Sequence, residues 1–149
     1  MTQTQQPFRF PEGTTAQITG IIQDETGAGI AAASLTTLKL TLYDLATDAI
    51  INSRTAQDVK NTNGGSVDAS GNLTMVLTPA DNVILGSAST SKALGDLMAA
   101  RGSQPLPLGG KARSQVETHV ALFEFTYSSG TKAGKTEVFL DVLNLNKVA

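Results

Sequence analysis

Apolar and polar residues alternate along several short stretches of this chain. The clearest stretch is LTTLKLTLYD at residues 35–44, where Leu38, Leu40 and Leu42 are separated by polar side chains. Successive side chains of a strand point to opposite faces, whereas a helix would scatter these leucines around its circumference. The pattern therefore predicts a half-buried strand whose leucines face a core.

The stretch from residue 117 to residue 142 predicts a long hairpin and is the most apolar part of the chain. On its first strand one face carries a mostly apolar set that we expect to point inward: His119, Ala121, Phe123, Phe125 and Tyr127. The sequence SSGTKAG at 128–134 predicts an exposed tip, since its glycines tolerate positive φ. In the returning strand Val138, Leu140 and Val142 alternate with Glu137, Phe139 and Asp141. Because a lone hairpin is marginal in water, the earlier strands must cover its apolar face.

The remaining elements are shorter. Residues 14–22 predict a first strand followed by a turn at 24–29, and residues 72–78 predict another strand. The segment AIINSR at 49–54 is expected to be a short strand, and 55–66 a loop. In TPADN, Thr78 suits a helix cap, Pro79 a first helical position and Asp81 the positive end of the helix dipole, which predicts one helical turn.

About six to eight short strands separated by turns, without β-α-β alternation, are typical of an all-β antiparallel sandwich or barrel. At 149 residues the chain fits one domain. We expect an extended N-terminal arm at 1–13, a single β-sandwich domain at 14–145 and a short tail at 146–149. An insertion at 85–115 with a short helix would lie between late strands of the sandwich.

The arm and the insertion are the candidate partner-binding segments. Phe8 and Phe10 are aromatics in a polar arm, and two interpretations stay open: they pack against the domain's own edge, or they anchor the arm on a neighbouring subunit. The insertion has apolar residues that a disordered linker does not need: Leu94, Leu97, Met98, Leu106 and Leu108. We therefore expect the insertion to contact a partner.

Charge and composition exclude several classes of function. Eleven basic and thirteen acidic residues give a net charge of −2 without a basic run, so direct nucleic-acid binding is not expected. The chain has no cysteine and one histidine, which excludes disulfide frameworks and thiolate or histidine-rich metal sites. No apolar stretch reaches the length of about 18 residues needed to span a membrane, and the N-terminus lacks the pattern of a signal peptide. We expect a protein made in a cytoplasm.

The sequence offers little catalytic chemistry. His119 is the single candidate for a general base near neutral pH, with Glu117 on the same strand face. No cysteine or GxSxG motif marks a nucleophile, so a histidine satisfied by a hydrogen bond is the default. The aspartates lie mostly in predicted turns, with Asp44 in a turn at 44–48, and do not have the EF-hand spacing. We therefore predict a non-enzymatic protein with no catalytic residue, cofactor or metal site.

Two stretches carry a resemblance to a known family. ITGIIQDETGAGIAAASLTTLKLTLYD resembles the opening of many immunoglobulin-like modules, with a strand, a D-x-x-G turn and a second strand. ETHVALFEFTYSSGTKAGKTEVFLDVLNL, together with INSR, GNLTMVLTPAD and the lack of cysteine, resembles small Ig-like proteins of tailed bacteriophage particles. The resemblance covers roughly residues 14–84 and 116–145; the insertion departs from a minimal Ig-like pattern, and no functional residues carry over.

This resemblance implies an Ig-like β-sandwich that serves as a structural virion component in the neck, tail, fibre attachment or capsid decoration. Its implied partners are other virion proteins, such as portal, neck, tail or capsid proteins, and copies of itself in a symmetric assembly. It would be made in the host cytoplasm and located in the virion, without nucleic-acid or membrane contacts. The alternatives are an Ig-like adhesion module of a bacterial surface protein, which predicts a secretion signal, and an enzyme, which predicts a clustered polar site.

Overall fold

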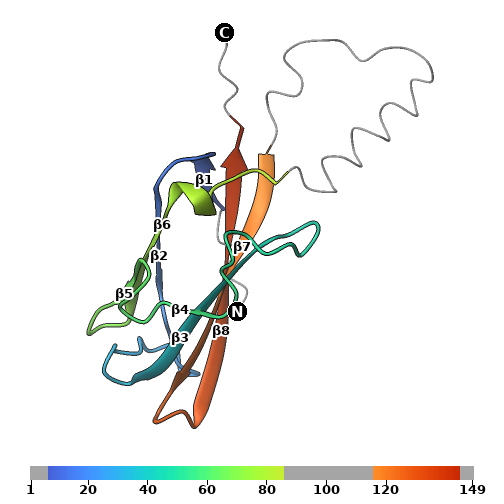
Figure 1. Ribbon diagram of the computed structural model, residues 1–149. Helices are drawn as coiled ribbons and strands as arrows, with labels where there is room; N and C mark the ends of the chain where they lie inside the picture. Colours follow the sequence, from blue (N-terminus) through green and yellow to red (C-terminus); the bar gives the residue numbers. More distant parts are fainter. Residues whose placement is uncertain (1–6, 86–115, 145–149) are drawn as a thin grey trace, which may run out of the picture.

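The computed structural model describes residues 7–85 and 116–144 as two facing sheets (Figure 1). The strands are β1 (Phe8–Pro11), β2 (Ala16–Ile21), β3 (Leu35–Asp44), β4 (Gln57–Asp58), β5 (Gly65–Val67), β6 (Asn72–Leu77), β7 (Val116–Tyr127) and β8 (Lys132–Leu143), with one 3-10 turn, η1 (Pro79–Asp81). The five-stranded sheet has the order β1-β8-β7-β3-β4, and the three-stranded sheet has the order β2-β6-β5. This arrangement confirms the predicted all-β sandwich. Among the described residues, no helix is long and apolar enough to cross a membrane.

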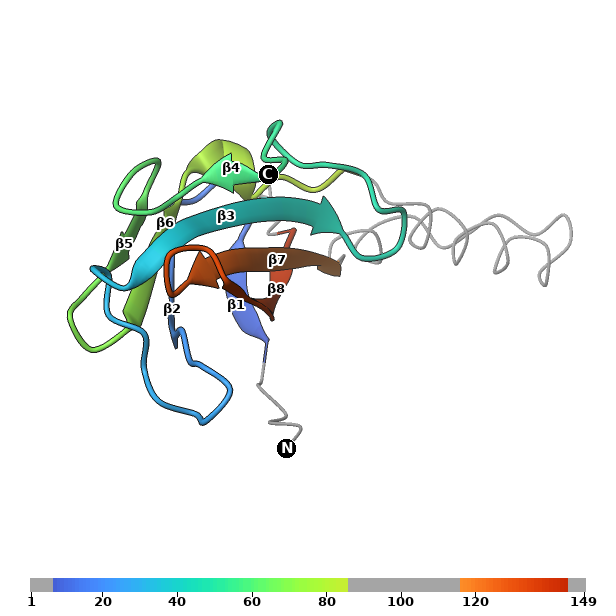
Figure 2. The same cartoon turned by 90° about the horizontal axis from the view of Figure 1, so that it is seen from below.

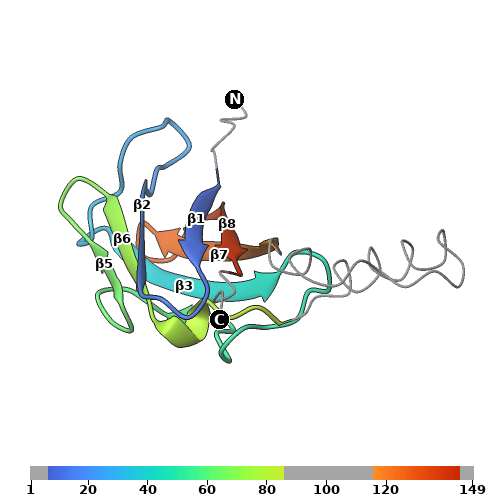
Figure 3. The same cartoon turned by 90° about the horizontal axis from the view of Figure 1, so that it is seen from above.

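All strand pairings in the described residues are antiparallel except one. Viewed from above, β1 lies beside β8 at the edge of the larger sheet (Figure 3). It runs parallel to β8, with Phe8 opposite Leu140 and Phe10 opposite Val142. Part of the segment expected to be an arm is therefore an edge strand. Aromatic side chains at alternate positions make this possible, because both can point toward the core while the backbone pairs with β8.

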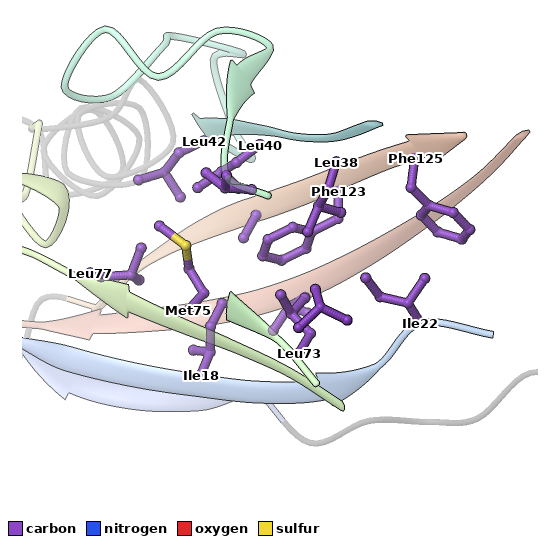
Figure 4. Packing of buried hydrophobic residues seen from close by; sticks show 14 of the residues in the cluster. Ile18, Ile22, Leu38, Leu40, Leu42, Leu73, Met75, Leu77, Phe123 and Phe125 are labelled. Atoms are coloured by element: carbon purple, nitrogen blue, oxygen red, sulfur yellow. The ribbon is translucent and has the colours of Figure 1, made fainter. Parts of the chain in front are cut away.

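The long strands β3, β7 and β8 form the centre of the larger sheet, and β3 curves across the sandwich (Figure 2). Leu38 lies opposite Phe125, Leu40 opposite Phe123, and Leu42 opposite Ala121. Met75, Leu77 and Ile18 approach from the smaller sheet, so the core fills the space between the layers (Figure 4). The predicted inward face of both long strands is confirmed, since Leu38, Leu40, Leu42 and Phe123 have no solvent exposure.

Three sequence predictions differ from the structure in detail. The hairpin tip is shorter than 128–134, because β8 begins at Lys132. Ser128, Ser129 and Gly130 take positive φ and reverse the chain within a few residues. Gly134 is already in the ladder, and a Cβ there would lie 2.5 Å from the Phe125 ring, so the glycine allows that ring to cover the strand.

The segment at 49–54 is not a strand. Ile50 makes a single bridge to Tyr43, and Asn52 and Ser53 take φ values of 51° and 56°, which break the extended backbone. Ile51 is nevertheless fully buried. The predicted loop at 55–66 also contains short strands, which its polar sequence does not indicate. Here β4 pairs with β3, and β5 pairs with β6. One helical turn follows β6 as predicted.

Candidate functional site

The predicted partner-binding residues fall into two groups. Phe8 and Phe10 are half-buried in β1, stack with ring centroids 6.1 Å apart, and pack against the core. The structure thus shows the first of the two interpretations for them, packing on the domain's own edge. The insertion residues lie outside the described residues, and their role stays a prediction: Leu94, Leu97, Met98, Leu106 and Leu108.

The inward face of β7 changes character toward its start. Beyond Phe123 and Ala121 the next inward positions are His119 and Glu117, which are 0% and 2% exposed. Nε2 of His119 lies 2.7 Å from Oε1 of Glu117, as neighbours two apart on one strand face permit. The Glu117 oxygen also accepts a hydrogen bond from the backbone amide of Leu85, at 2.9 Å. The histidine is therefore held by a hydrogen bond, as expected from the sequence.

Asp44 completes this group from the adjacent strand. It is the cross-strand neighbour of His119 and is 1% exposed. Its Oδ2 accepts hydrogen bonds from the amide and the hydroxyl of Thr47, at 3.1 and 2.6 Å, which close the turn after β3. Its Oδ1 and the Nδ1 of His119 are buried and have no hydrogen-bond partner among the described residues.

Asp44, Glu117 and His119 together form what we call the inner cluster. One potential ligand atom from each lies within 4.8 Å of the other two. The sequence contained a usable signal, because Asp44 continues the inward alternation of Leu38, Leu40 and Leu42 by one more step. The prediction placed Asp44 in a turn and therefore missed that it faces His119 across the ladder.

A second buried polar group, which sequence reasoning also missed, joins Arg54 to Asp81. The guanidinium Nε and Nη2 of Arg54 lie 2.5 and 2.7 Å from the two carboxylate oxygens of Asp81. Asn52 and the amide of Thr78 donate further hydrogen bonds to Asp81, at 2.8 and 2.7 Å. Burial would raise the pKa of Asp81, but the hydrogen bonds from Arg54, Asn52 and Thr78 outweigh it and hold that pKa below its ordinary value.

This pair fastens the loop after β3 to the turn after β6. Arg54 also donates hydrogen bonds to Oε1 of Gln57 and to the carbonyl of Asn63, at 2.5 and 3.3 Å. The guanidinium therefore has hydrogen-bond partners besides Asp81. With both charges paired and hydrogen-bonded, the group is structural in character. We assign it no chemistry.

A third polar group lies at the hairpin tip, where Glu25 and Lys132 are exposed and Tyr127 is largely buried. Glu25, in the turn after β2, accepts hydrogen bonds from Lys132 and from the hydroxyl of Tyr127, the latter at 2.5 Å. The hydrogen bond from Lys132, followed by that from Tyr127, lowers the pKa of Glu25 from 4.5 to about 2. These contacts connect the tip of the β7–β8 hairpin with the smaller sheet's loop.

Three exposed apolar residues lie near the start of β7. Leu45, Leu85 and Val116 are 49%, 44% and 47% exposed, and we call them the apolar rim. The amide of Leu45 bonds the carbonyl of Thr118 at 3.0 Å, and the amide of Leu85 bonds Glu117. The backbone amides of Leu45 and Leu85 and the residue Val116 therefore lie near the first residues of β7. Val116 pairs with Leu143 at this end of the ladder.

The described structure thus offers a surface suited to contact and a buried polar cluster. An oxygen-and-nitrogen cluster of this kind could bind a cation or hold a proton, whereas the rim could bury apolar area against a partner. Comparisons with models of protein families, with curated proteins and with solved structures find no match to this chain.

Proposed function

We propose that this protein is a non-enzymatic structural component of a tailed-bacteriophage virion. It would act by protein–protein contacts in the neck, the tail, the fibre attachment or the capsid decoration. Its partners would be portal, neck, tail or capsid proteins and further copies of itself. The resemblance over residues 14–84 and 116–145 suggests the virion, and the all-β sandwich of the described residues is compatible with it.

The observation that carries the proposal is the apolar rim. Leu45, Leu85 and Val116 expose close to half of their surface on one end of the sandwich. Burial of these exposed side chains against a partner would be favourable, because it removes apolar surface from water. A symmetric particle would engage many such small surfaces together, so that each contact needs little affinity alone.

The test is co-assembly with defined proteins. The purified full chain is mixed in turn with the portal, neck, tail and capsid proteins encoded beside it, and complexes are measured by size-exclusion chromatography with light scattering and by electron microscopy. We expect one of these proteins to bind the chain. The Leu45→Asp variant should weaken that complex about tenfold or more, because it places a charge in a desolvated contact.

The matched control is Ile21→Asp. Ile21 is 55% exposed but lies in β2 of the smaller sheet, outside the apolar rim. It should leave the complex unchanged. Equal weakening by both variants would remove the rim from the interface, and a failure of every virion protein to bind would refute the proposal. So would a hydrolytic activity of the full chain that His119→Gln abolishes with the fold intact.

A further inference from the structure

The inner cluster has the residue types and the spacing of a cation site. Asp44, Glu117 and His119 each offer a ligand atom, and these atoms lie within 4.8 Å of one another. The three side chains are 1%, 2% and 0% exposed. Two of them are neighbours on one face of β7, and the third lies directly across the ladder on β3. The positions of all three are therefore set by the pairing of β3 with β7 at one end of the ladder.

The second observation is an incomplete set of hydrogen bonds. Within the described part of the chain, Oδ1 of Asp44 is buried and accepts no hydrogen bond, although Oδ2 of the same carboxylate accepts two. Buried polar atoms in folded proteins are nearly always paired, and a bare carboxylate oxygen is costly. A cation between Asp44 and His119 would satisfy that oxygen.

We propose that the inner cluster binds one divalent transition-metal ion, best matched by Zn²⁺. Ligation by one imidazole nitrogen and two carboxylate oxygens suits Zn²⁺, whereas Ca²⁺ and Mg²⁺ prefer sites made only of oxygen. No sequence motif marks such a site, because its ligands come from strands far apart in the chain. The ion would join β3 to β7 beside the apolar rim, and this proposal is independent of the virion role.

The geometry requires a small adjustment. Ligand atoms around a tetrahedral Zn²⁺ lie about 3.3 Å apart for bonds of about 2.0 Å. The His119–Glu117 contact of 2.7 Å is shorter, so the ion would replace this hydrogen bond rather than add to it. The imidazole would then bind through the nitrogen that now faces Glu117, and its proton would move to Nδ1.

The experiment uses the purified full chain. Protein treated with EDTA and dialysed is titrated with ZnCl₂ by calorimetry, and bound zinc is counted by mass spectrometry of the metal after gel filtration. We expect one Zn²⁺ per chain and a higher thermal midpoint in its presence. Asp44→Asn and His119→Gln should each lower the affinity about tenfold or more. The matched control is Asp141→Asn, a 9% exposed carboxylate in β8 that lies outside the cluster.

Cobalt provides a readout that does not depend on the variants. Co²⁺ bound to the wild-type chain with tetrahedral nitrogen and oxygen ligands should give visible absorption that Zn²⁺ abolishes by competition. Stoichiometric zinc binding that Asp44→Asn weakens and Asp141→Asn spares supports the site. Absence of zinc binding by the wild-type chain, an octahedral cobalt spectrum, or equal losses in Asp44→Asn and Asp141→Asn would overturn it. If a variant does not fold, the cobalt spectrum of the wild type decides.

Discussion

The two ends of the β3–β7 ladder share one inward face but differ completely in chemistry. Toward the hairpin tip, Leu38 and Leu40 lie opposite Phe125 and Phe123, and these side chains build the core. At the other end, Asp44 lies opposite His119 on the same face. Strand periodicity therefore decides which residues are buried, whereas it does not decide whether a buried position is apolar.

Burial has opposite consequences at the two ends. An apolar side chain gains about 25 cal/mol for each Å² removed from water, so the Leu–Phe end stabilises the fold. A buried carboxylate loses hydration and must recover it from partners. Arg54 and Asp81 show the paired solution in this molecule, with two guanidinium contacts to one carboxylate. The inner cluster differs, because Oδ1 of Asp44 has no such partner in the described structure.

The largest expected effect concerns the buried ion pair of Arg54 and Asp81. Arg54→Ala leaves Asp81 buried without its guanidinium, and we expect a loss of about 3–5 kcal/mol in unfolding free energy. The loss would be measured by urea unfolding followed by circular dichroism. The pKa of Asp81 lies below 3.8, so its stabilising contribution is present above that pH and lost as the pH falls through the folded-state pKa. A loss below about 1 kcal/mol would show that the pair contributes little.

The apolar end is tested by Leu40→Ala. Leu40 is 0% exposed and lies opposite Phe123, so the variant leaves a cavity between the sheets. We expect a loss of about 2–5 kcal/mol in the same unfolding assay. Val76→Ala is the control, since Val76 is 38% exposed on β6 and should cost much less. Similar losses for the two variants would contradict the assigned inward face of β3.

A smaller effect is expected where the core meets the hairpin tip. Gly134→Ala introduces a Cβ that would lie 2.5 Å from the Phe125 ring, and the ring or the strand must move. We expect a cost of about 1–3 kcal/mol, measured by thermal or urea unfolding. Gly20→Ala in β2 is the control, because a Cβ there meets no atom within 4 Å. An unchanged stability for Gly134→Ala would mean that the Phe125 ring is not held in place.

The inner cluster should respond differently from the core. Asp44→Asn keeps a side-chain oxygen for the amide of Thr47 and removes the buried charge. The metal-free protein should therefore change by less than about 1 kcal/mol in unfolding free energy. Urea unfolding in the presence of EDTA measures this. A loss as large as that of Leu40→Ala would show that the carboxylate has a stabilising partner in the metal-free fold.

The smallest effect concerns the exposed contact of Glu25 with Lys132 and Tyr127. Because the pKa of Glu25 is lowered from 4.5 to about 2, its contribution is fully present above pH 4.5 and is lost as the pH falls toward 2. The thermal midpoints of the wild type and Glu25→Gln should therefore converge over this range. Added salt should narrow the difference at neutral pH. Parallel pH profiles for the two proteins would contradict the lowered pKa.

Residue alternation along the chain was enough to predict the strand faces of the sandwich. The alternation at 35–44 and at 117–127 predicted which side of β3 and of β7 is buried, and both faces are confirmed. Local turn chemistry also sufficed for the turn after β2, where Oδ1 of Asp24 accepts hydrogen bonds from the amides of Thr26 and Ala28. These features depend on neighbours in the chain, and side-chain period and turn geometry are local properties.

The tertiary structure alone decided which distant residues meet. The parallel pairing of β1 with β8, the contact of Arg54 with Asp81 and the register that brings Asp44 opposite His119 all join residues far apart in sequence. The sequence around a polar residue can be the same whether that residue lies in an exposed turn or on the buried face of a sheet. The difference comes from the other strands that surround it. Periodicity could have placed Asp44 on the inward face. Only the register between β3 and β7 shows that His119 lies opposite it.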